Sequence, residues 1–203
     1  IGIGWVSMVL VTAEWRRHGF ATRLVSACTS ILRDAGRAAL LDAAPAATAI
    51  YAALGYGPLC MMERWEGPGD GVAVQSAPVD LALEQSAFDA DRRFLLEDFL
   101  SRPDSGSFKS QHGFAILRSG SVASQIGPIV AEPAEAVALV TDAIRSASGR
   151  VLVDVLDAGK GLIPTLTAHG FRPQRQFTRM ALGLTELPGD SAKLLAAAGP
   201  EFG

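Results

Sequence analysis

The most informative stretch of this chain is a short apolar run that leads through a basic turn into a helix: Val9-Leu10-Val11-Thr12-Ala13-Glu14-Trp15-Arg16-Arg17-His18-Gly19-Phe20-Ala21-Thr22. Apolar and β-branched side chains over residues 6–11 predict a buried strand. Residues 20–34 then predict a helix that ends at Gly36, with one apolar face formed by residues at helical spacing: Leu24, Cys28, Ile31 and Leu32. This part of the chain is therefore predicted to form a strand, a turn and a helix.

A turn of this kind can bind a phosphate group. The first N–H groups of a helix have no partner within it, and the helix dipole adds about half a positive charge there. Gly19 would let the backbone approach an anion without a Cβ in the way. Further positive charge comes from the three residues before it: Arg16, Arg17 and His18. A solvated basic turn with an ordinary turn glycine explains the same residues, so both interpretations stand on these grounds.

The residues that follow predict a second strand and a short helix. A strand at residues 38–41 leads to Asp42, and a helix at residues 48–54 ends at Gly55-Tyr56. A closing strand is expected at residues 60–65. Gly and Pro are concentrated at residues 66–71, which predicts a linker. We therefore expect two domains, residues 1–66 and 72–203.

The second half of the chain looks like a weak copy of the first. Helices are expected at residues 88–100, 134–146 and 162–168, and strands at residues 114–117, 124–131, 151–155 and 177–182. Both halves contain a strand that ends at an aspartate, then a loop, a short helix and a Gly-aromatic exit. The matching residues are Asp42 with Asp154, and Gly55-Tyr56 with Gly170-Phe171. Because any two βαβα segments resemble each other, chance similarity is the alternative explanation.

Two motifs carry a family resemblance. Arg16-Arg17-His18-Gly19-Phe20-Ala21 resembles the (Gln/Arg)-x-x-Gly-x-(Gly/Ala) pyrophosphate loop of the GNAT superfamily of N-acetyltransferases. Ile50-Tyr51-Ala52-Ala53-Leu54-Gly55-Tyr56 resembles the Leu-Tyr-x-x-Leu-Gly-Phe helix end of that family. The resemblance covers residues 6–65 and implies an α/β (α+β) fold with a mixed twisted sheet flanked by helices. The whole chain resembles tandem GNAT proteins with a degenerate second copy. The first copy is expected to lack its N-terminal part, because residues 1–5 run directly into the predicted core strand.

The resemblance also implies an acetyl-CoA cosubstrate and assigns its site. Backbone groups of Val9, Leu10 and Val11 would pair with the pantetheine arm. The pyrophosphate would lie in the basic turn and on the helix start, formed by Arg16, Arg17, His18, Gly19, Phe20, Ala21 and Thr22. Many members carry an Asn in the loop before the second helix, whereas residues 43–47 of this chain contain none.

Two residues are implied to take part in catalysis. Tyr51 would be the general acid that protonates the departing thiolate, and Asp42 would accept the proton of the amine. Each has a second interpretation. Tyr51 fits a packed aromatic residue with its hydroxyl at the surface, and Asp42 fits a turn or cap residue.

The second copy lacks this chemistry. Its strand passes through Glu132-Pro133 into a helix without a basic turn or a glycine, and Leu166 stands where the first copy has Tyr51. We therefore expect one acetyl-CoA per chain. Four polar residues could line a substrate pocket between the halves, although each also fits an ordinary strand-end residue: Gln125, Asp154, Asp157 and Arg179.

The sequence thus favours an acetyl-CoA-dependent N-acetyltransferase that moves an acetyl group directly to a primary amine of a small-molecule or peptide acceptor. The alternatives are a non-catalytic acyl-CoA-binding or regulatory module and an interaction protein with a basic turn. The acceptor and the oligomeric state are not specified by the sequence.

Composition narrows the partners and the compartment. The formal net charge of −3 gives no general attraction to nucleic acid or to an anionic membrane. Charged residues interrupt every apolar run that could span a bilayer. Cys28 and Cys60 are too few for a disulfide framework and lack zinc-site spacing, so no metal is expected. A cytoplasmic location is the expectation.

Overall fold

The computed structural model of the chain describes residues 2–72 and 76–203. Ile1 and residues 73–75, which fall in the predicted first and second domains, lie outside the described residues. The chain folds into two compact units, each built from separate segments. Unit 1 comprises Ile1–Met61, Gln176–Leu187 and Pro200–Gly203, and unit 2 comprises Met62–Arg175 and Pro188–Gly199.

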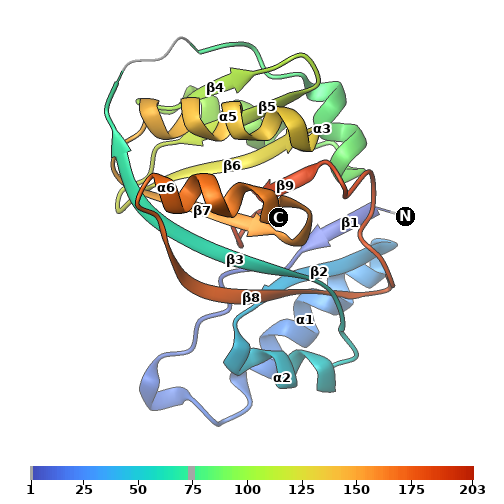
Figure 1. Cartoon of the computed structure of the whole chain (residues 1–203). Helices are drawn as coiled ribbons and strands as arrows, with labels where there is room; N and C mark the ends of the chain where they lie inside the picture. The colour runs from blue at the N-terminus through green and yellow to red at the C-terminus, as the bar shows by residue number, and fades with distance from the viewer. Residues whose placement is uncertain (1, 73–75) are drawn as a thin grey trace. The chain divides into compact units, whose positions relative to one another are not determined.

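Unit 1 is built around strands β1, β2 and β8 and the helices α1 and α2 (Figure 1). Strand β1 (Gly2–Trp5) runs parallel to β2 (Arg37–Ala43), and β2 is antiparallel to the end of β8 (Arg172–Leu182). Helix α1 (Phe20–Asp34) packs on β2 through Val25, which is fully buried. The short helices η2 (Pro45–Ala47) and α2 (Thr48–Ala53) follow β2.

The nine described strands form one mixed sheet instead of the two expected for tandem copies, and unit 2 contains the larger part of this sheet. The strand order in unit 2 is β3 (Gly57–Asp70), β7 (Ser148–Leu156), β9 (Leu194–Ala197), β6 (Ser124–Ala131), β5 (Gly113–Arg118) and β4 (Gly106–Lys109). Figure 1 shows α5 (Pro133–Ser146) lying across β5 and β6, where its apolar residues join the core. The remaining helices are α3 (Leu81–Phe88), α4 (Arg93–Ser101), η3 (Asp157–Leu162) and α6 (Ile163–Ala168).

Two strands pass from one unit to the other. Strand β3 leaves unit 1 at Met61, and its remaining residues pair with β7 in unit 2. Strand β8 leaves unit 2 at Arg175, and its remaining residues pair with β2 in unit 1. Each unit is thus completed by a strand that follows a short helix of the other unit. Neither unit consists of one continuous segment.

The mixed α/β architecture and most elements agree with the sequence analysis, but four local predictions are wrong. The helix predicted at residues 88–100 begins only at Arg93, because α3 ends at Phe88 and the chain turns at Asp89, whose φ is +54°. The first strand is Gly2–Trp5 instead of residues 6–11, because the chain turns away at Met8, whose φ is +56°. Residues 66–70, predicted as part of a linker, continue β3 and pair with β7. The buried face of α1 contains Val25 and Leu32, whereas Leu24 and Ile31 are 49% and 69% exposed.

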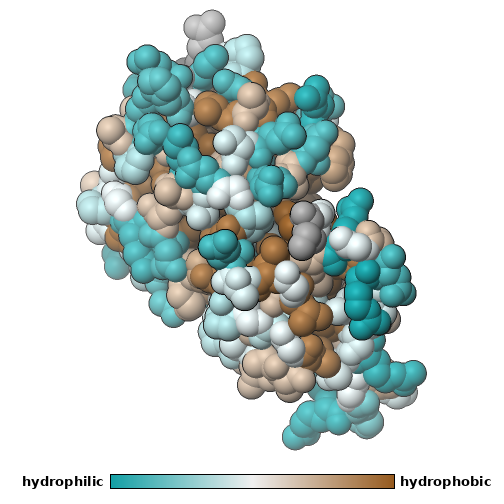
Figure 2. Space-filling model, turned by 90° about the vertical axis from the view of Figure 1, so that its right-hand side faces the viewer, coloured by the Kyte–Doolittle hydropathy of each residue, from teal (hydrophilic) through white to brown (hydrophobic). Residues whose placement is uncertain are grey.

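Apolar side chains also reach the molecular surface, seen as brown areas in Figure 2. In unit 1 the most exposed of them lie before and within α1: Met8, Leu10, Trp15 and Ile31. None of the helices in the described residues is both long enough and apolar enough to cross a membrane.

Candidate active site

The basic turn before α1 is held in shape by its own hydrogen bonds. The short helix η1 (Ala13–Trp15) is closed by the Trp15 N–H, which donates to the Thr12 carbonyl at 3.0 Å. Arg16 Nε donates to the Val11 carbonyl at 3.1 Å, and His18 Nδ1 donates to the Arg16 carbonyl at 2.8 Å. These bonds fold residues 11–18 into a compact turn. The turn is therefore ordered by local contacts.

The turn ends in a left-handed glycine that begins α1. Gly19 has φ +76°, and an added Cβ would have no heavy atom within 4 Å. Such a φ favours glycine, and the empty space above it leaves room for a ligand. The N–H groups of Phe20, Ala21 and Thr22 lie in the first turn of α1, where no earlier helical carbonyl is available to them.

Charge at this helix start is positive. Arg16, Arg17 and His18 are all exposed, and α1 has no acidic residue in its first turn. The positive end of the helix dipole adds to this field. The residues predicted to bind a pyrophosphate thus form an exposed basic cradle with backbone donors, and this arrangement fits a doubly charged anion.

Strands β1 and β2 diverge after Trp5, before the chain reaches the basic turn. Their pairing extends to Trp5 and Leu40, and the Val6 N–H donates to the Leu40 carbonyl at 2.8 Å. Strand β2 continues to Ala43, whereas the segment that follows β1 no longer pairs with β2 after Val6. The residues predicted to pair with a pantetheine arm, Val9 to Val11, lie beyond this point of divergence. They are not part of a strand, so their predicted strand conformation is corrected.

Tyr51 lies in α2 and packs, with Val9, against the core cluster of unit 1. It is half-buried, and its ring centroid is 6.2 Å from that of Tyr56. Burial raises the pKa of the Tyr51 phenol above its usual 10.0. The hydroxyl is therefore protonated at neutral pH, as a proton donor must be.

Gly55 and Tyr56 form the C-terminal cap of α2. The Tyr56 N–H donates to the Tyr51 carbonyl at 3.1 Å, and the Gly55 N–H donates to the Ala52 carbonyl at 3.0 Å. These two bonds and the φ of +90° at Gly55 form a Schellman motif. The Tyr56 hydroxyl lies 2.7 Å from Thr29 Oγ1 and thereby links this cap to α1.

Helix α6 of unit 2 ends in the same way. The Phe171 N–H donates to the Leu166 carbonyl at 2.9 Å, and the Gly170 N–H donates to the Thr167 carbonyl at 3.0 Å. Gly170 has a φ of +81°. Leu166 therefore occupies the same position of the motif as Tyr51. The two helices thus end with the same hydrogen bonds, and a leucine stands in unit 2 where unit 1 has a tyrosine.

Asp42, the predicted base, is engaged in a buried ion pair. Its side chain is 0% exposed, and both carboxylate oxygens accept hydrogen bonds from Arg179, each at 2.9 Å. The two residues stand directly opposite each other on β2 and β8. The guanidinium also lies 4.7 Å from the centroid of the Trp5 ring. Because no part of the carboxylate is exposed, its geometry favours a structural role.

Unit 2 contains the same kind of pair. Asp154 is 0% exposed and accepts hydrogen bonds from Arg64 at 2.8 and 2.7 Å, and from Gln125 Nε2 at 3.0 Å. Gln125 and Asp154 were predicted to line a pocket together with Asp157 and Arg179. Instead, the first two are buried together in unit 2 and Arg179 binds Asp42 in unit 1, while Asp157 forms an exposed pair with Lys160 at 2.6 Å.

Strand β9 fills the space between β6 and β7. These two strands pair over Ser124–Ile126 and then diverge. Beyond that point β9 pairs with Ile129 and Val130 on one side and with Asp154 and Val155 on the other (Figure 1, red strand). The Ala131 N–H also donates to the Lys193 carbonyl at 3.0 Å. Among the described residues, β2 has no strand partner beyond Leu40 on its β1 side, whereas β9 pairs with β7 beyond the divergence of β6 and β7.

The start of α5 offers no anion cradle. Strand β6 ends at Ala131, Glu132 caps α5, and Pro133 is its first residue. The Glu132 carboxylate pairs with Lys193 at 3.1 Å. Pro133 has no N–H to donate to an anion, and Glu132 places a negative charge directly before the helix.

Sequence reasoning missed Trp5, Arg64 and strand β9. One signal was available for Arg64: the spacing from Gly55 to Arg64 equals the spacing from Gly170 to Arg179. When the two Gly-aromatic motifs are aligned, this equal spacing places Arg64 and Arg179 at the same position. The described residues of unit 1 contain no strand placed as β9 is, so a comparison of the two halves does not indicate it.

Comparisons with known proteins agree with this architecture. A sequence model described as an acetyltransferase (GNAT) domain matches residues 81–196, more than half of the chain. A search of curated proteins finds no match. Among solved structures, a provisionally assigned acetyltransferase from Pyrococcus horikoshii has a TM-score of 0.83 and 17% identity, covering 100% of this chain and 73% of that one.

Two further solved structures are similar. A GCN5-related N-acetyltransferase from Kribbella flavida has a TM-score of 0.52 and 19% identity, covering 87% of this chain and 51% of that one. A tandem GNAT protein from the clavulanic acid biosynthesis pathway has a TM-score of 0.53 and 14% identity, covering 88% and 74%. At these identities the three structures indicate a shared fold.

The family match and the motifs lie in different parts of the chain. The match covers residues 81–196, whereas the resemblance found in the sequence rests on residues 16–21 and 50–56. The match is therefore independent of the basic turn and of Tyr51. Together with the mixed sheet and its helices, it shows that the chain belongs to the GNAT family of acetyltransferases.

Proposed function

We propose that this protein is an acetyl-CoA-dependent N-acetyltransferase that transfers an acetyl group directly to a primary amine of a small-molecule or peptide acceptor. Membership of the family implies an acyl-CoA cosubstrate. The observation that carries the proposal is the ordered basic turn that ends in left-handed Gly19 at the start of α1. It supplies backbone donors and positive charge for a pyrophosphate.

In this proposal unit 1 holds the cosubstrate. Residues 16–22 bind the pyrophosphate, and Val9 to Val11 offer backbone groups to the pantetheine arm where β1 and β2 part. The cosubstrate supplies an activated thioester. The chain holds it beside β2 and excludes water with the apolar residues of the unit 1 core.

Tyr51 is the proposed general acid. Its raised pKa keeps the hydroxyl protonated, and a positioned phenol can protonate a thiolate whose conjugate acid has a pKa of about 8.5. Asp42 is less suited to be the base, since its carboxylate is fully buried against Arg179. The same pair recurs in unit 2, which has Leu166 in place of the tyrosine. We infer that Asp42 has a structural role.

We further propose that the chain contains two GNAT-like copies whose last strands are exchanged. The support is the repeated Schellman motif, the repeated Asp–Arg pair and the passage of β3 and β8 between the units. We also propose that the first copy ends and the second begins within residues 66–72, as the sequence predicted. The second copy keeps the fold and lacks the chemistry.

The proposal is tested by a thiol-release assay with acetyl-CoA and a panel of amines. Release of CoA that depends on an amine, with the acetylated product seen by mass spectrometry, supports the transferase. Binding of acetyl-CoA without turnover on any amine would instead support a non-catalytic acyl-CoA-binding module. Absence of acetyl-CoA binding would contradict both.

Replacing Gly19 with Val is expected to weaken acetyl-CoA binding by about tenfold or more, equivalent to about 1.4 kcal/mol or above. The left-handed φ of +76° strains a β-branched residue, and its side chain would enter the open space above the turn. Calorimetric titration measures the change. Gly36→Val is the matched control, because Gly36 has a φ of +67° and open space at the opposite end of α1. Equal affinity in both variants would remove the turn from the mechanism.

One chain is expected to bind one acetyl-CoA. In unit 2 the space between the diverging strands is taken by β9, and the start of α5 presents Glu132 and Pro133. Titration should give a stoichiometry near one, and a photoreactive acyl-CoA should label peptides of unit 1. A stoichiometry near two, or labelling of residues 129–131, would show that unit 2 also binds the cosubstrate.

A further inference from the structure

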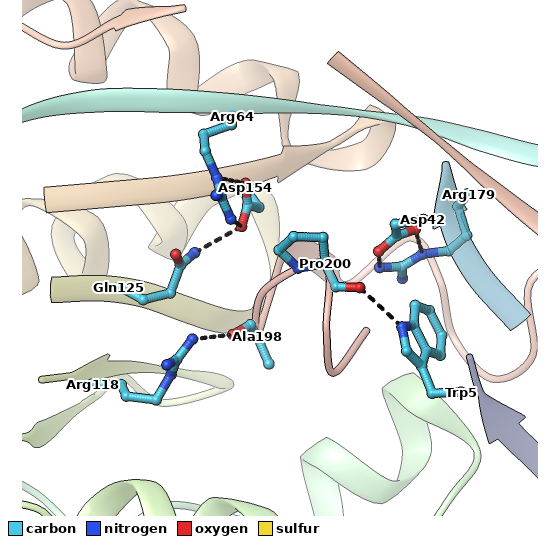
Figure 3. Close-up of polar contacts among 9 residues, drawn as sticks. All are labelled: Trp5, Asp42, Arg64, Arg118, Gln125, Asp154, Arg179, Ala198 and Pro200. Carbon is cyan, nitrogen blue, oxygen red and sulfur yellow. Dashed lines mark hydrogen bonds and ion pairs between the residues drawn. The ribbon is translucent and has the colours of Figure 1, made fainter. Parts of the chain in front are cut away.

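Each unit contains a three-residue cluster around a buried carboxylate at the point where two parallel strands diverge. We call these clusters braces. Figure 3 shows the brace of unit 1, formed by Trp5, Asp42 and Arg179. The same figure shows the brace of unit 2, formed by Gln125, Asp154 and Arg64. In both, the side-chain carboxylate is fully buried and accepts hydrogen bonds from the Nε and Nη2 of an arginine.

The strand register shows that the two braces are equivalent. Trp5 lies opposite Leu40, two residues before Asp42. Gln125 lies opposite Leu152, two residues before Asp154. The arginines come from β8 and β3, the strands that pass between the units, and each stands directly opposite its aspartate. Each brace therefore contains one residue from each of three equivalent strands.

A brace links both strands next to the opening between them. In unit 1, Arg179 binds Asp42 of β2 and lies over the ring of Trp5, the last residue of β1. In unit 2, Asp154 of β7 accepts hydrogen bonds from Arg64 of β3 and from Gln125 of β6. Beyond this brace the opening accepts one strand, β9, which pairs with both sides. The spacing next to a brace is thus that of one extended chain.

We propose that Arg179 is a positioning residue that sets the width of the unit 1 opening to that of a pantetheine arm. The proposal rests on the proposed function. Arg179 is 1% exposed, so it acts through Asp42 and Trp5 and does not contact the cosubstrate. Its planar guanidinium can bind a carboxylate with two parallel bonds and stack on an indole at the same time. A lysine can do neither in the same geometry.

This role makes the second copy necessary for the site in the first. Arg179 follows α6 in sequence and belongs to the strand that unit 2 supplies to unit 1. A copy without cosubstrate chemistry of its own therefore contributes a residue that shapes the binding site of the other copy. The two braces would then have different functions. The brace of unit 1 would set the distance between two strands for a ligand, and the brace of unit 2 would set it for β9.

The test compares two ligands in the full chain carrying Arg179→Lys. Acetyl-CoA contains the pantetheine arm, whereas adenosine 3′,5′-bisphosphate lacks it and retains the phosphates that the basic turn would bind. We expect the affinity for acetyl-CoA to fall by about tenfold or more, and the affinity for the bisphosphate to stay within about twofold. A general loss of folded protein would weaken both ligands together, so the difference between them reports on the opening.

Arg64→Lys is the matched control, because it alters the brace of unit 2 and is expected to leave both affinities unchanged. If Arg179→Lys does not fold, Trp5→Leu tests the same brace by removing the ring beneath the guanidinium, with the same selective loss expected. Equal loss of both ligands, or no loss of acetyl-CoA binding in a folded variant, would overturn the role of Arg179. Failure of the wild-type protein to bind acetyl-CoA would instead overturn the proposed function.

Discussion

Replacing Tyr51 with Phe is expected to lower kcat by roughly 10²–10⁴-fold while the affinity for acetyl-CoA stays nearly unchanged. The substitution keeps the ring that packs in the unit 1 core and removes only the hydroxyl. Without that hydroxyl the leaving thiolate loses its positioned proton donor. A change confined to kcat distinguishes lost chemistry from lost binding.

The neighbouring tyrosine provides the matched control. Tyr56 is 3% exposed, and its hydroxyl bonds to Thr29 Oγ1 at 2.7 Å. Tyr56→Phe removes a hydroxyl from the same cluster but no proposed proton donor, so its kcat should change by far less. The measurement is steady-state turnover, with a burst experiment to confirm that chemistry limits the rate. Equal turnover of the wild type and Tyr51→Phe under those conditions would assign Tyr51 to packing.

The largest expected effect on stability comes from Asp154→Ala. This substitution leaves the buried guanidinium of Arg64 without its carboxylate and Gln125 without its acceptor. Removing one partner of a buried ion pair typically costs about 3–5 kcal/mol, because the remaining charge stays out of water without compensation. Urea unfolding of the full chain carrying Trp5→Phe and Trp15→Phe, in which Trp65 of the unit 2 core is the remaining tryptophan, measures the loss by fluorescence.

A second ion pair on the same two strands serves as the control. Arg150 binds Glu66 with two bonds of 2.8 Å, but these side chains are 44% and 33% exposed. Water replaces the lost partner there, so Glu66→Ala should change stability much less. The double variant Asp154→Leu with Arg64→Met should recover part of the loss, because it removes both buried charges. Equal effects of Asp154→Ala and Glu66→Ala would contradict the importance of burial.

Much of the fold could be predicted from local signals in the sequence. Helices α1, α2 and α5 were predicted within one residue at each end, because periodic apolar residues and Gly or Pro mark their limits. The basic turn and Gly19 were also identified correctly as the start of α1. These features depend on residues close together in the chain. Local periodicity and turn chemistry are sufficient for them.

The errors concern features that depend on distant partners. Residues 66–70 contain Gly and Pro, but β7 offers them a complete set of strand partners and so they extend β3. Residues 6–11 are apolar, yet β1 is paired only as far as Trp5. Asp42 looked like an available carboxylate because Arg179 is 137 residues away. No local pattern could indicate these contacts.

The exchange of strands has a consequence for synthesis on the ribosome. The sequence separation between Asp42 and its partner Arg179 is 137 residues, whereas that between Arg64 and Asp154 is 90 residues. At about 5–20 residues per second, the first interval lasts roughly 7–27 s. During this time β2 has been made, but the strand that covers its edge has not. The edge of β2 therefore stays without its partner strand until β8 emerges, and unit 2 is completed later still, because its strand β9 is translated after β8.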